Sequence, residues 1–257
     1  MLKLILTEHG KLPEDIKPIF ANTGKEMEET LDFVEECSQR WSVPITWVEY
    51  RKSRNFEVVD HKTASRKGEP YEAIIEERSY LPNPIARFCT VELKIRTMHR
   101  YLHSLGWEEW TSCVGMRADE PRRVAKLSNP SEGNYETRIA PLAKAGVTVQ
   151  GVGAFWKASP FDLRLPNMNG KTMHGNCDLC FLKGENQVVS LIREEPRRAI
   201  WWIEQEAKIK SKGRFKGDGA RFRNDRASYQ RMYEMALSHG ELFGYDEPLE
   251  DCFCNAS

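Results

Sequence analysis

The residues best suited to chemistry in this sequence are its cysteines. Cys177 and Cys180 form a Cys-x-x-Cys pair, and Cys252 and Cys254 form a Cys-x-Cys pair further along the chain. Two thiolates on one tight turn can hold a single metal ion or one edge of a metal cluster. A complete centre needs further ligands, and the candidates are Cys89 and the two cysteines of the second pair.

The spacing of Cys177 and Cys180 leaves several interpretations open. Four thiolates could bind zinc or an iron–sulfur cluster, and the spacing does not distinguish these two centres. The pair could also be a redox-active dithiol, or two unrelated buried thiols. The chain has seven cysteines, an odd number that suits a disulfide framework poorly. We therefore predict reduced thiols and a cytoplasmic protein, with Cys37 and Cys113 as core residues.

A second candidate site is the turn that follows an apolar run at residues 16–21. This turn, Asn-Thr-Gly-Lys-Glu, contains Thr23, Gly24 and Glu26. Ligands of open α/β sheets bind at the carboxyl ends of parallel strands, and a glycine there lets the backbone approach a nucleotide closely. The alternative is an ordinary strand-to-helix turn in which Thr23 caps the helix.

Two basic segments point to an anionic partner. Residues 115–123 contain three arginines, among them Arg117, and the planar guanidinium suits phosphate or sulfate. The stretch Lys208–Arg231 has nine Lys or Arg and two Asp, a local charge of plus seven. It could be a lid over a polyanionic substrate or a nucleic-acid contact. For both segments the alternative is a solvated charged loop.

The pattern of apolar residues predicts the elements that position these side chains. A strand at 16–21, a helix at 27–41 and a strand at 45–50 form a right-handed parallel crossover. The polar residues 52–70 are predicted to be an irregular surface excursion. Further predicted elements are a helix ending near Gly10, a helix at 89–105, a strand at 110–115, a sheet edge at 139–142, and helices at 187–210 and 227–239.

We predict an α/β fold with a boundary near residue 150. Residues 1–150 form the parallel-sheet core, and residues 151–257 form a helical part with both close cysteine pairs. The 257 residues are 40% hydrophobic, with 38 basic and 38 acidic side chains. This composition is globular, and zero net charge gives no global attraction to nucleic acid or membrane. The apolar runs are too short for a membrane span or a signal peptide.

Five segments together resemble the phosphoadenosine phosphosulfate (PAPS) reductase family, in consistent order over most of the chain. They are Phe20–Val34, Cys89–Ile95, Val114–Glu120, Ala140–Leu142 and Asn176–Gly184. The resemblance implies a twisted parallel sheet with flanking helices, the Rossmann-like fold of the adenine-nucleotide α-hydrolase-like superfamily. It also implies that ATP or PAPS binds at the strand ends, next to Thr23, Gly24, Glu26, Lys94, Gly115 and Arg117.

The same resemblance implies a 4Fe-4S cluster. Its expected ligands are Cys89, Cys177, Cys180 and Cys252, with zinc as the alternative metal. The sequence is most similar to the phage and bacterial branch that carries a terminal Cys-Phe-Cys, so one tail cysteine would complete the cluster and the other would react. The expected catalytic residues are therefore Cys254 or Cys252, with Arg117 stabilising negative charge.

Two features depart from the family pattern. Family chains begin with a strand and a Ser-Gly-Gly-x-x-Ser loop that cradles phosphates, whereas residues 1–6 match the helix after that loop. Either the start codon is assigned too late or the chain is a truncated product, and we expect the first. Cluster-binding relatives often have adjacent cysteines, whereas Cys89 stands alone, and the Glu-Cys-Gly-x-His segment of assimilatory reductases is replaced by the Cys-Phe-Cys tail.

These observations predict a PAPS reductase-family enzyme that performs sulfonucleotide reduction or a related sulfur transfer. Its partners would be an adenine nucleotide and a thiol reductant or sulfur donor. A second hypothesis is an ATP-dependent sulfurtransferase of the N-type ATP pyrophosphatases, which thiolates a nucleic acid held by Lys208–Arg231. A third hypothesis is a degenerate, non-catalytic nucleotide-binding module.

Overall fold

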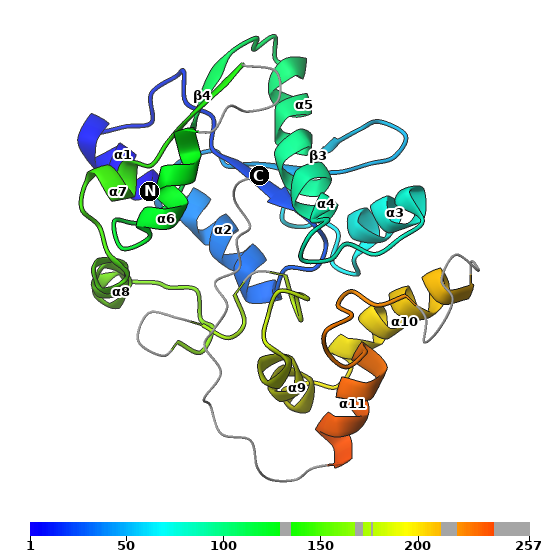
Figure 1. Ribbon diagram of the computed structural model, residues 1–257. Coiled ribbons are helices and arrows are strands. Elements are labelled where there is room, and N and C mark those ends of the chain that lie inside the picture. The colour runs from blue at the N-terminus through cyan, green and yellow to red at the C-terminus, as the bar shows by residue number, and fades with distance from the viewer. Residues whose placement is uncertain (129–134, 168–171, 176, 212–219, 239–257) are drawn as a thin grey trace.

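The computed structural model describes residues 1–128, 135–167, 172–175, 177–211 and 220–238. This part of the chain combines helices with two small sheets (Figure 1). Within these ranges, every helix is too short or too polar to cross a membrane. The tail cysteines Cys252 and Cys254 lie outside the described residues, as does the middle of the basic stretch.

The first sheet contains the predicted crossover. Strand β1 (Ile19–Asn22) pairs in parallel with β2 (Thr46–Glu49), and helix α2 (Glu28–Arg40) connects them. Helix α2 has acidic residues in its first turn and an arginine in its last turn, which complements the helix dipole. Its buried Leu31 packs in one apolar cluster with Trp47 of β2, so burial of apolar surface holds the helix on the sheet.

Residues 52–70 are more regular than predicted. They contain strand β3 (Glu57–Val59), which pairs antiparallel with β2, and they lead into helix α3 (Glu69–Arg78). Tyr71, Ile74 and Ile75 of α3 are buried and lie at i, i+3 and i+4, so they form one apolar stripe. This stripe covers little more than one turn and is therefore a weak helix signal in the sequence.

The predicted helix at 89–105 is present, with an irregular turn inside it. Helices α4 (Phe88–Thr90) and α5 (Thr97–Ser104) flank a π-helical turn, η1 (Val91–Arg96). Glu92 in this turn is buried and forms ion pairs with three arginines, one each from α3, η1 and α5. Such turns displace side chains from ordinary helical spacing and are frequent at functional sites.

The second sheet contains β4 (Trp110–Cys113) and β5 (Glu136–Ile139), which pair in parallel. Strand β4 lies within the strand predicted at 110–115. Strand β5 ends where the predicted sheet edge at 139–142 begins, because Pro141 starts the short helix α7 (Pro141–Lys144). Between β4 and β5 the chain forms α6 (Pro121–Val124) and a 3₁₀ turn.

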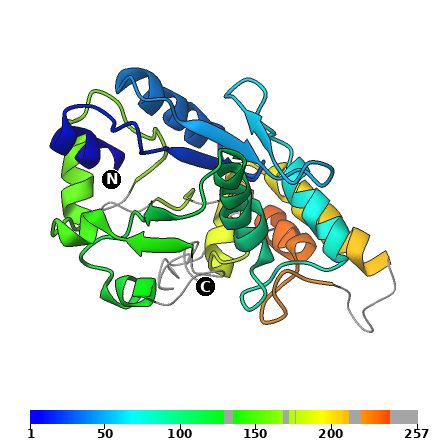
Figure 2. The same ribbon diagram turned by 90° about the horizontal axis from the view of Figure 1, so that it is seen from above.

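The two sheets replace the single twisted parallel sheet that the resemblance implies. Strands β1–β3 and β4–β5 are separate, and β3 runs antiparallel (Figure 2). A cavity of about 550 Å³ is lined by Phe20 of β1, Thr111 of β4 and Ile5 of helix α1 (Leu2–His9). Among the described residues, β1 pairs only with β2, and β4 pairs only with β5. Each sheet therefore ends at an edge without a hydrogen-bonded strand.

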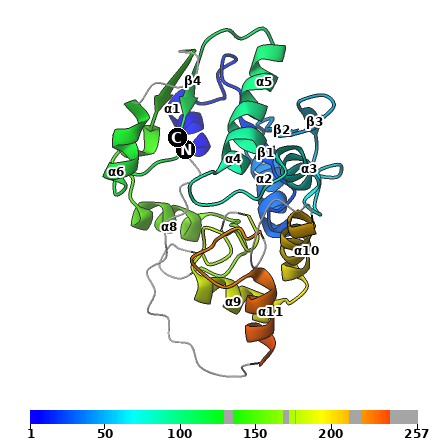
Figure 3. The same cartoon turned by 45° about the vertical axis from the view of Figure 1, so that its right-hand side comes forward.

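Four longer helices follow the second sheet. They are α8 (Val149–Ala158), α9 (Glu185–Glu194), α10 (Arg198–Ser211) and α11 (Tyr229–Ser238). The last three lie in the regions predicted at 187–210 and 227–239, with a break at Pro196 between α9 and α10. Figure 3 shows α9, α10 and α11 at the end of the molecule away from β4.

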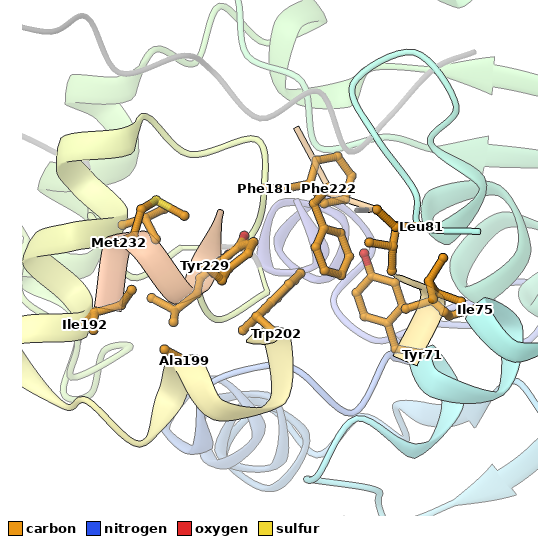
Figure 4. Packing of buried hydrophobic residues seen from close by; sticks show 14 of the residues in the cluster. Tyr71, Ile75, Leu81, Phe181, Ile192, Ala199, Trp202, Phe222, Tyr229 and Met232 are labelled. Carbon is orange, nitrogen blue, oxygen red and sulfur yellow. The ribbon is translucent and has the colours of Figure 1, made fainter. Parts of the chain in front are cut away.

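The main hydrophobic core joins these helices to the first part of the chain. Trp202 of α10 is fully buried and stacks on Tyr229 of α11, with ring centroids 5.0 Å apart. It also meets Tyr71 of α3 edge-on (Figure 4). Phe181, which directly follows the Cys-x-x-Cys turn, stacks on Phe222 in the same core. One core therefore positions α3, α10 and the cysteine turn relative to one another.

Candidate functional site

The carboxylate of Glu26 organises the turn after β1. Glu26 Oε2 accepts hydrogen bonds from the backbone N–H groups of Thr23 and Lys25, at 2.9 and 3.3 Å. The Thr23 hydroxyl donates to the same oxygen at 2.9 Å. Gly24 has a φ of 77°, and its N–H donates to Asn22 Oδ1 at 3.1 Å. The turn is therefore a well-bonded loop at the carboxyl end of β1, where ligands of parallel sheets bind.

Two glycines allow other segments to pack closely against this turn. A Cβ on Gly24 would lie 3.0 Å from Pro70 Cδ, at the start of α3. A Cβ on Gly68 would lie 2.7 Å from the ring of Trp201, on α10. Side chains at these positions would therefore push α3 and α10 away from the turn.

Replacing Gly68 with alanine is expected to destabilise the fold more than the same change at Gly106. Both glycines have positive φ, 90° and 82°, so both variants carry left-handed strain of about 1–2 kcal/mol. Only Gly68→Ala also forces Trp201 to move, which adds about 1–3 kcal/mol of overpacking. A Cβ at Gly106 meets nothing within 4 Å. Chemical denaturation measures the difference, and equal losses would contradict the close packing.

Lys94 reaches the turn from the π-helical segment η1. Its Nζ lies 3.9 Å from Glu26 Oε1, and its side chain is partly exposed. The structure thus brings together Thr23, Gly24, Glu26 and Lys94, four of the residues expected at the nucleotide. An ammonium group at the carboxyl end of a parallel strand suits a phosphate or sulfate group.

The Cys-x-x-Cys turn packs directly against the turn after β1. The Thr23 hydroxyl oxygen and the Cys177 sulfur are 3.5 Å apart. The backbone N–H of Asp178 donates to the carbonyl oxygen of Lys25 at 2.6 Å. Cys177 and Cys180 are both buried. Two turns that lie far apart in the sequence therefore form one site.

Cys89 of α4 approaches this site next to the buried phenol of Tyr71. Burial raises the pKa of Tyr71 well above its ordinary value, and the charges of Cys89, Cys180 and Cys177 raise it further. The Tyr71 side chain is also hydrogen-bonded to Cys89. All three cysteines therefore lie near one phenol, and we call Cys89, Cys177 and Cys180 the three-cysteine centre.

Several buried hydrogen-bond donors lack a partner in this region. Arg198 Nη1, Trp201 Nε1 and Trp202 Nε1 all belong to α10, and none has a hydrogen-bond partner among the described residues. The rings of Trp201 and Trp202 lie 5.2 and 5.9 Å from that of Tyr71. A buried donor without an acceptor costs about 1–3 kcal/mol, so these groups fit an anionic centre.

The predicted anion-binding loop with Arg117 lies after β4, in the other sheet. Arg117 Nε donates to Asp119 at 2.9 Å, and its Nη1 lies 3.4 Å from Glu120 Oε2. Gly115 lines the cavity between the sheets. Within the described part of the chain, the hydrogen bonds and ion pairs of Arg117 stay in its own loop. Among the described residues, Arg117 therefore makes no hydrogen bond or ion pair with Thr23, Gly24, Glu26 or Lys94, whereas Gly115 lines the same cavity as Phe20 of β1.

The described basic residues of Lys208–Arg231 are largely engaged within the protein. Lys208 forms an ion pair with Glu72 of α3, and two of the arginines pair with acidic residues close by in the sequence. Residues 212–219 carry further basic side chains and lie outside the described residues. The described part of this stretch therefore gives no specific support to nucleic-acid binding.

A second group of metal-ligand types lies on the surface. One ligand atom each from Glu28, Asp32 and His61 lies within 4.8 Å of the others. His61 Nε2 is 2.7 Å from Asp32 Oδ1, and Glu28 accepts a hydrogen bond from Arg66 at 2.8 Å. His61 is therefore paired with Asp32 and Glu28 with Arg66, so we assign this group no metal.

Three residues of the site do not stand out in the sequence. Lys25 belongs to the turn motif, but its burial depends on Trp201 of α10. Tyr71 and Trp201 occupy helical segments that carry no chemical motif. The Gly68-Glu-Pro70 start of α3 is a helix-start signal and could have located Tyr71.

Two comparisons relate the chain to known proteins. The model of the phosphoadenosine phosphosulfate reductase domain family matches residues 1–148. The chain is 25% identical over 201 residues to a protein of Escherichia phage lambda named "uncharacterized nin region protein ORF290". That alignment covers 74% of this chain and 64% of the phage protein, so the chain spans less than two thirds of the length of this relative. No solved structure matches the chain.

Proposed function

Since the chain belongs to the phosphoadenosine phosphosulfate reductase domain family, we propose that it binds an adenine nucleotide and performs sulfur chemistry beside it. The observation that supports this most is the 3.5 Å contact between Thr23, in the expected nucleotide turn, and Cys177. An anion held at the first turn would lie next to thiols of the second. The reaction proposed is sulfonucleotide reduction or a related sulfur transfer.

Lys94 is the residue of this turn best suited to the phosphate or sulfate of the nucleotide. Its ammonium is partly exposed and lies close to Glu26. Thr23, Gly24 and Glu26 would lie beside the adenosine. Arg117 would act on the anion from the end of β4, where Asp119 and Glu120 orient its guanidinium.

We propose that the three-cysteine centre and Cys252 together hold a 4Fe-4S cluster. The donor set fits, because three sulfur atoms lie near Tyr71 and the unpaired donors of α10 suit an anionic centre. When bound, such a cluster supplies one-electron redox chemistry and a strong local charge. Zinc, which four thiolates also bind, would make the same cysteines a structural clip.

Cys254 is the proposed nucleophile. Its thiolate would attack the sulfur of the PAPS sulfonate, so that a new S–S bond forms while the S–O bond to the phosphate breaks. The electron pair leaves with adenosine 3′,5′-bisphosphate, and Lys94 and Arg117 would stabilise the negative charge that develops. A thiol reductant would then attack the Cys254 sulfur, form a disulfide with it and release sulfite.

Nucleotide binding tests this proposal. We expect calorimetry to detect binding of PAPS, adenylyl sulfate or ATP. Lys94→Met is expected to weaken that binding about ten- to a hundredfold, because one charge-assisted hydrogen bond contributes about 1.5–3 kcal/mol. Lys157→Met, at an exposed position of α8, is the matched control. Binding of none of the three nucleotides would refute the proposal, and equal binding by both variants would remove Lys94 from the site.

A further inference from the structure

Lys25 places a positive charge inside the protein, next to the cysteine turn. Only 9% of the residue is exposed, and its Nζ has no hydrogen bond or ion pair among the described residues. Burial lowers the pKa of Lys25, while the charges of Asp178, Cys177, Glu26 and Glu69 oppose this effect. A buried ammonium without a close partner is costly, so this arrangement calls for negative charge nearby.

Asp178 alone does not balance the positive charge around the cysteine turn. Lys25, Arg198 and Lys183 all act on its carboxylate. The Lys183 ammonium donates to two backbone carbonyl oxygens, whereas Arg198 Nη1 is buried without a hydrogen-bond acceptor among the described residues. Three cations therefore act on the one carboxylate of the cysteine turn. Glu26 and Glu69 also act on Lys25 from outside that turn, and within the turn the Cys177 sulfur is the group that adds its charge to that of Asp178.

Packing fixes the position of the Lys25 side chain. Its Nζ lies 5.0 Å from the centre of the Trp201 ring, in a cation–π contact. The absence of a Cβ at Gly68 leaves room for both the Lys25 chain and that ring. The backbone of Lys25 is in turn hydrogen-bonded to the N–H of Asp178. The backbone hydrogen bond and the packing of the side chain thus both keep the Lys25 ammonium close to the cysteine turn.

We propose that Lys25, supported by Arg198, supplies positive charge that stabilises the cluster held by the three-cysteine centre and raises the reduction potential of that cluster. The inference rests on the proposed cluster. A cluster held by these cysteines would gain one negative charge when an external donor such as dithionite supplies one electron, with no bond made or broken. A fixed cation favours the more negative state, and low local dielectric strengthens its effect.

A redox titration of the full chain, reconstituted anaerobically with iron and sulfide and followed by EPR spectroscopy, tests this inference. We expect Lys25→Met to shift the midpoint potential to a more negative value, and Lys25→Arg to keep a value close to that of the parent chain. Arg198→Met is expected to give a smaller shift of the same sign. Lys157→Met on α8 controls for the loss of one exposed positive charge. Iron and sulfide per chain are measured for every variant.

An unchanged potential in Lys25→Met, with iron and sulfide intact, would overturn the inference and leave the cluster proposal standing. An equal shift in Lys157→Met would also overturn it, because net charge alone would then explain the effect. A parent chain without iron and sulfide would overturn both proposals together. If Lys25→Met does not fold, the midpoint potential of Arg198→Met is the test. An unchanged potential in Arg198→Met would then overturn the inference.

Discussion

Replacing Cys177 with alanine is expected to abolish the iron and acid-labile sulfide of the anaerobically purified protein. The parent chain is expected to hold about four of each per molecule, as a 4Fe-4S cluster does. Cys177 is one of two thiols on the turn that packs against Thr23. Its removal leaves that edge of the cluster with a single protein ligand, and a buried cluster with an open site is readily lost.

The matched control is Cys37→Ala, which removes another buried cysteine. Burial raises the pKa of Cys37 to about 11, with a further contribution from the charge of Glu36, so this thiol stays neutral and is a poor ligand. We expect Cys37→Ala to retain iron and sulfide in full. Retention of both in Cys177→Ala would exclude Cys177 as a ligand. Zinc without sulfide in the parent chain would identify a structural zinc clip instead.

Trp202→Ala is expected to lower the free energy of unfolding by about 3–5 kcal/mol, the usual cost of deleting a large buried aromatic side chain. Trp202 has no exposed surface, and its ring lies 5.0 Å from that of Tyr229 and 4.8 Å from that of Phe222. Its removal leaves a cavity between α10 and α11. Because a domain has only about 5–15 kcal/mol of net stability, the loss is a large fraction of the total.

The control for this variant is Ile200→Ala, on the same helix. Ile200 is 47% exposed, so we expect Ile200→Ala to lower the free energy of unfolding much less than Trp202→Ala does. Trp202 also contacts Tyr71, which lies beside the three-cysteine centre, so Trp202→Ala is expected to reduce the iron content as well. Urea denaturation followed by circular dichroism measures both stabilities. Equal losses in the two variants would show that Trp202 is not central to the core.

The elements with strong local patterns were predictable, and those with weak patterns were not. Helix α2 repeats apolar residues at helical spacing, and β1 and β2 are short apolar runs that flank it. The spacing of the apolar residues and the order strand, helix, strand are therefore enough to define the crossover. Helix α3 has only a short apolar stripe, made by Tyr71, Ile74 and Ile75. Helix α8 contains two glycines, which lower its intrinsic helix propensity, and it has no buried residue.

Sheet topology depended on contacts that no local pattern encodes. The run that forms β4 is recognisable as a strand, whereas β5 lies just before the sheet edge predicted at 139–142, and nothing in either run specifies its partner along the other edge. In the structure they pair with each other, and a cavity separates them from β1. Strand pairing is set by the packing of segments far apart in the chain, which single-sequence patterns do not contain.

By itself the sequence determined the chemistry that the chain can offer: the Cys-x-x-Cys pair, the turn at Thr23–Glu26 and the basic residue Lys94, in an order that identifies the family. Only the tertiary structure decided which of these groups meet. It placed Thr23 against Cys177, left Arg117 in a separate loop, and buried Lys25 under Trp201. The reason is physical: residue type follows from the sequence, but burial, desolvation and charge balance depend on distant segments that share one core.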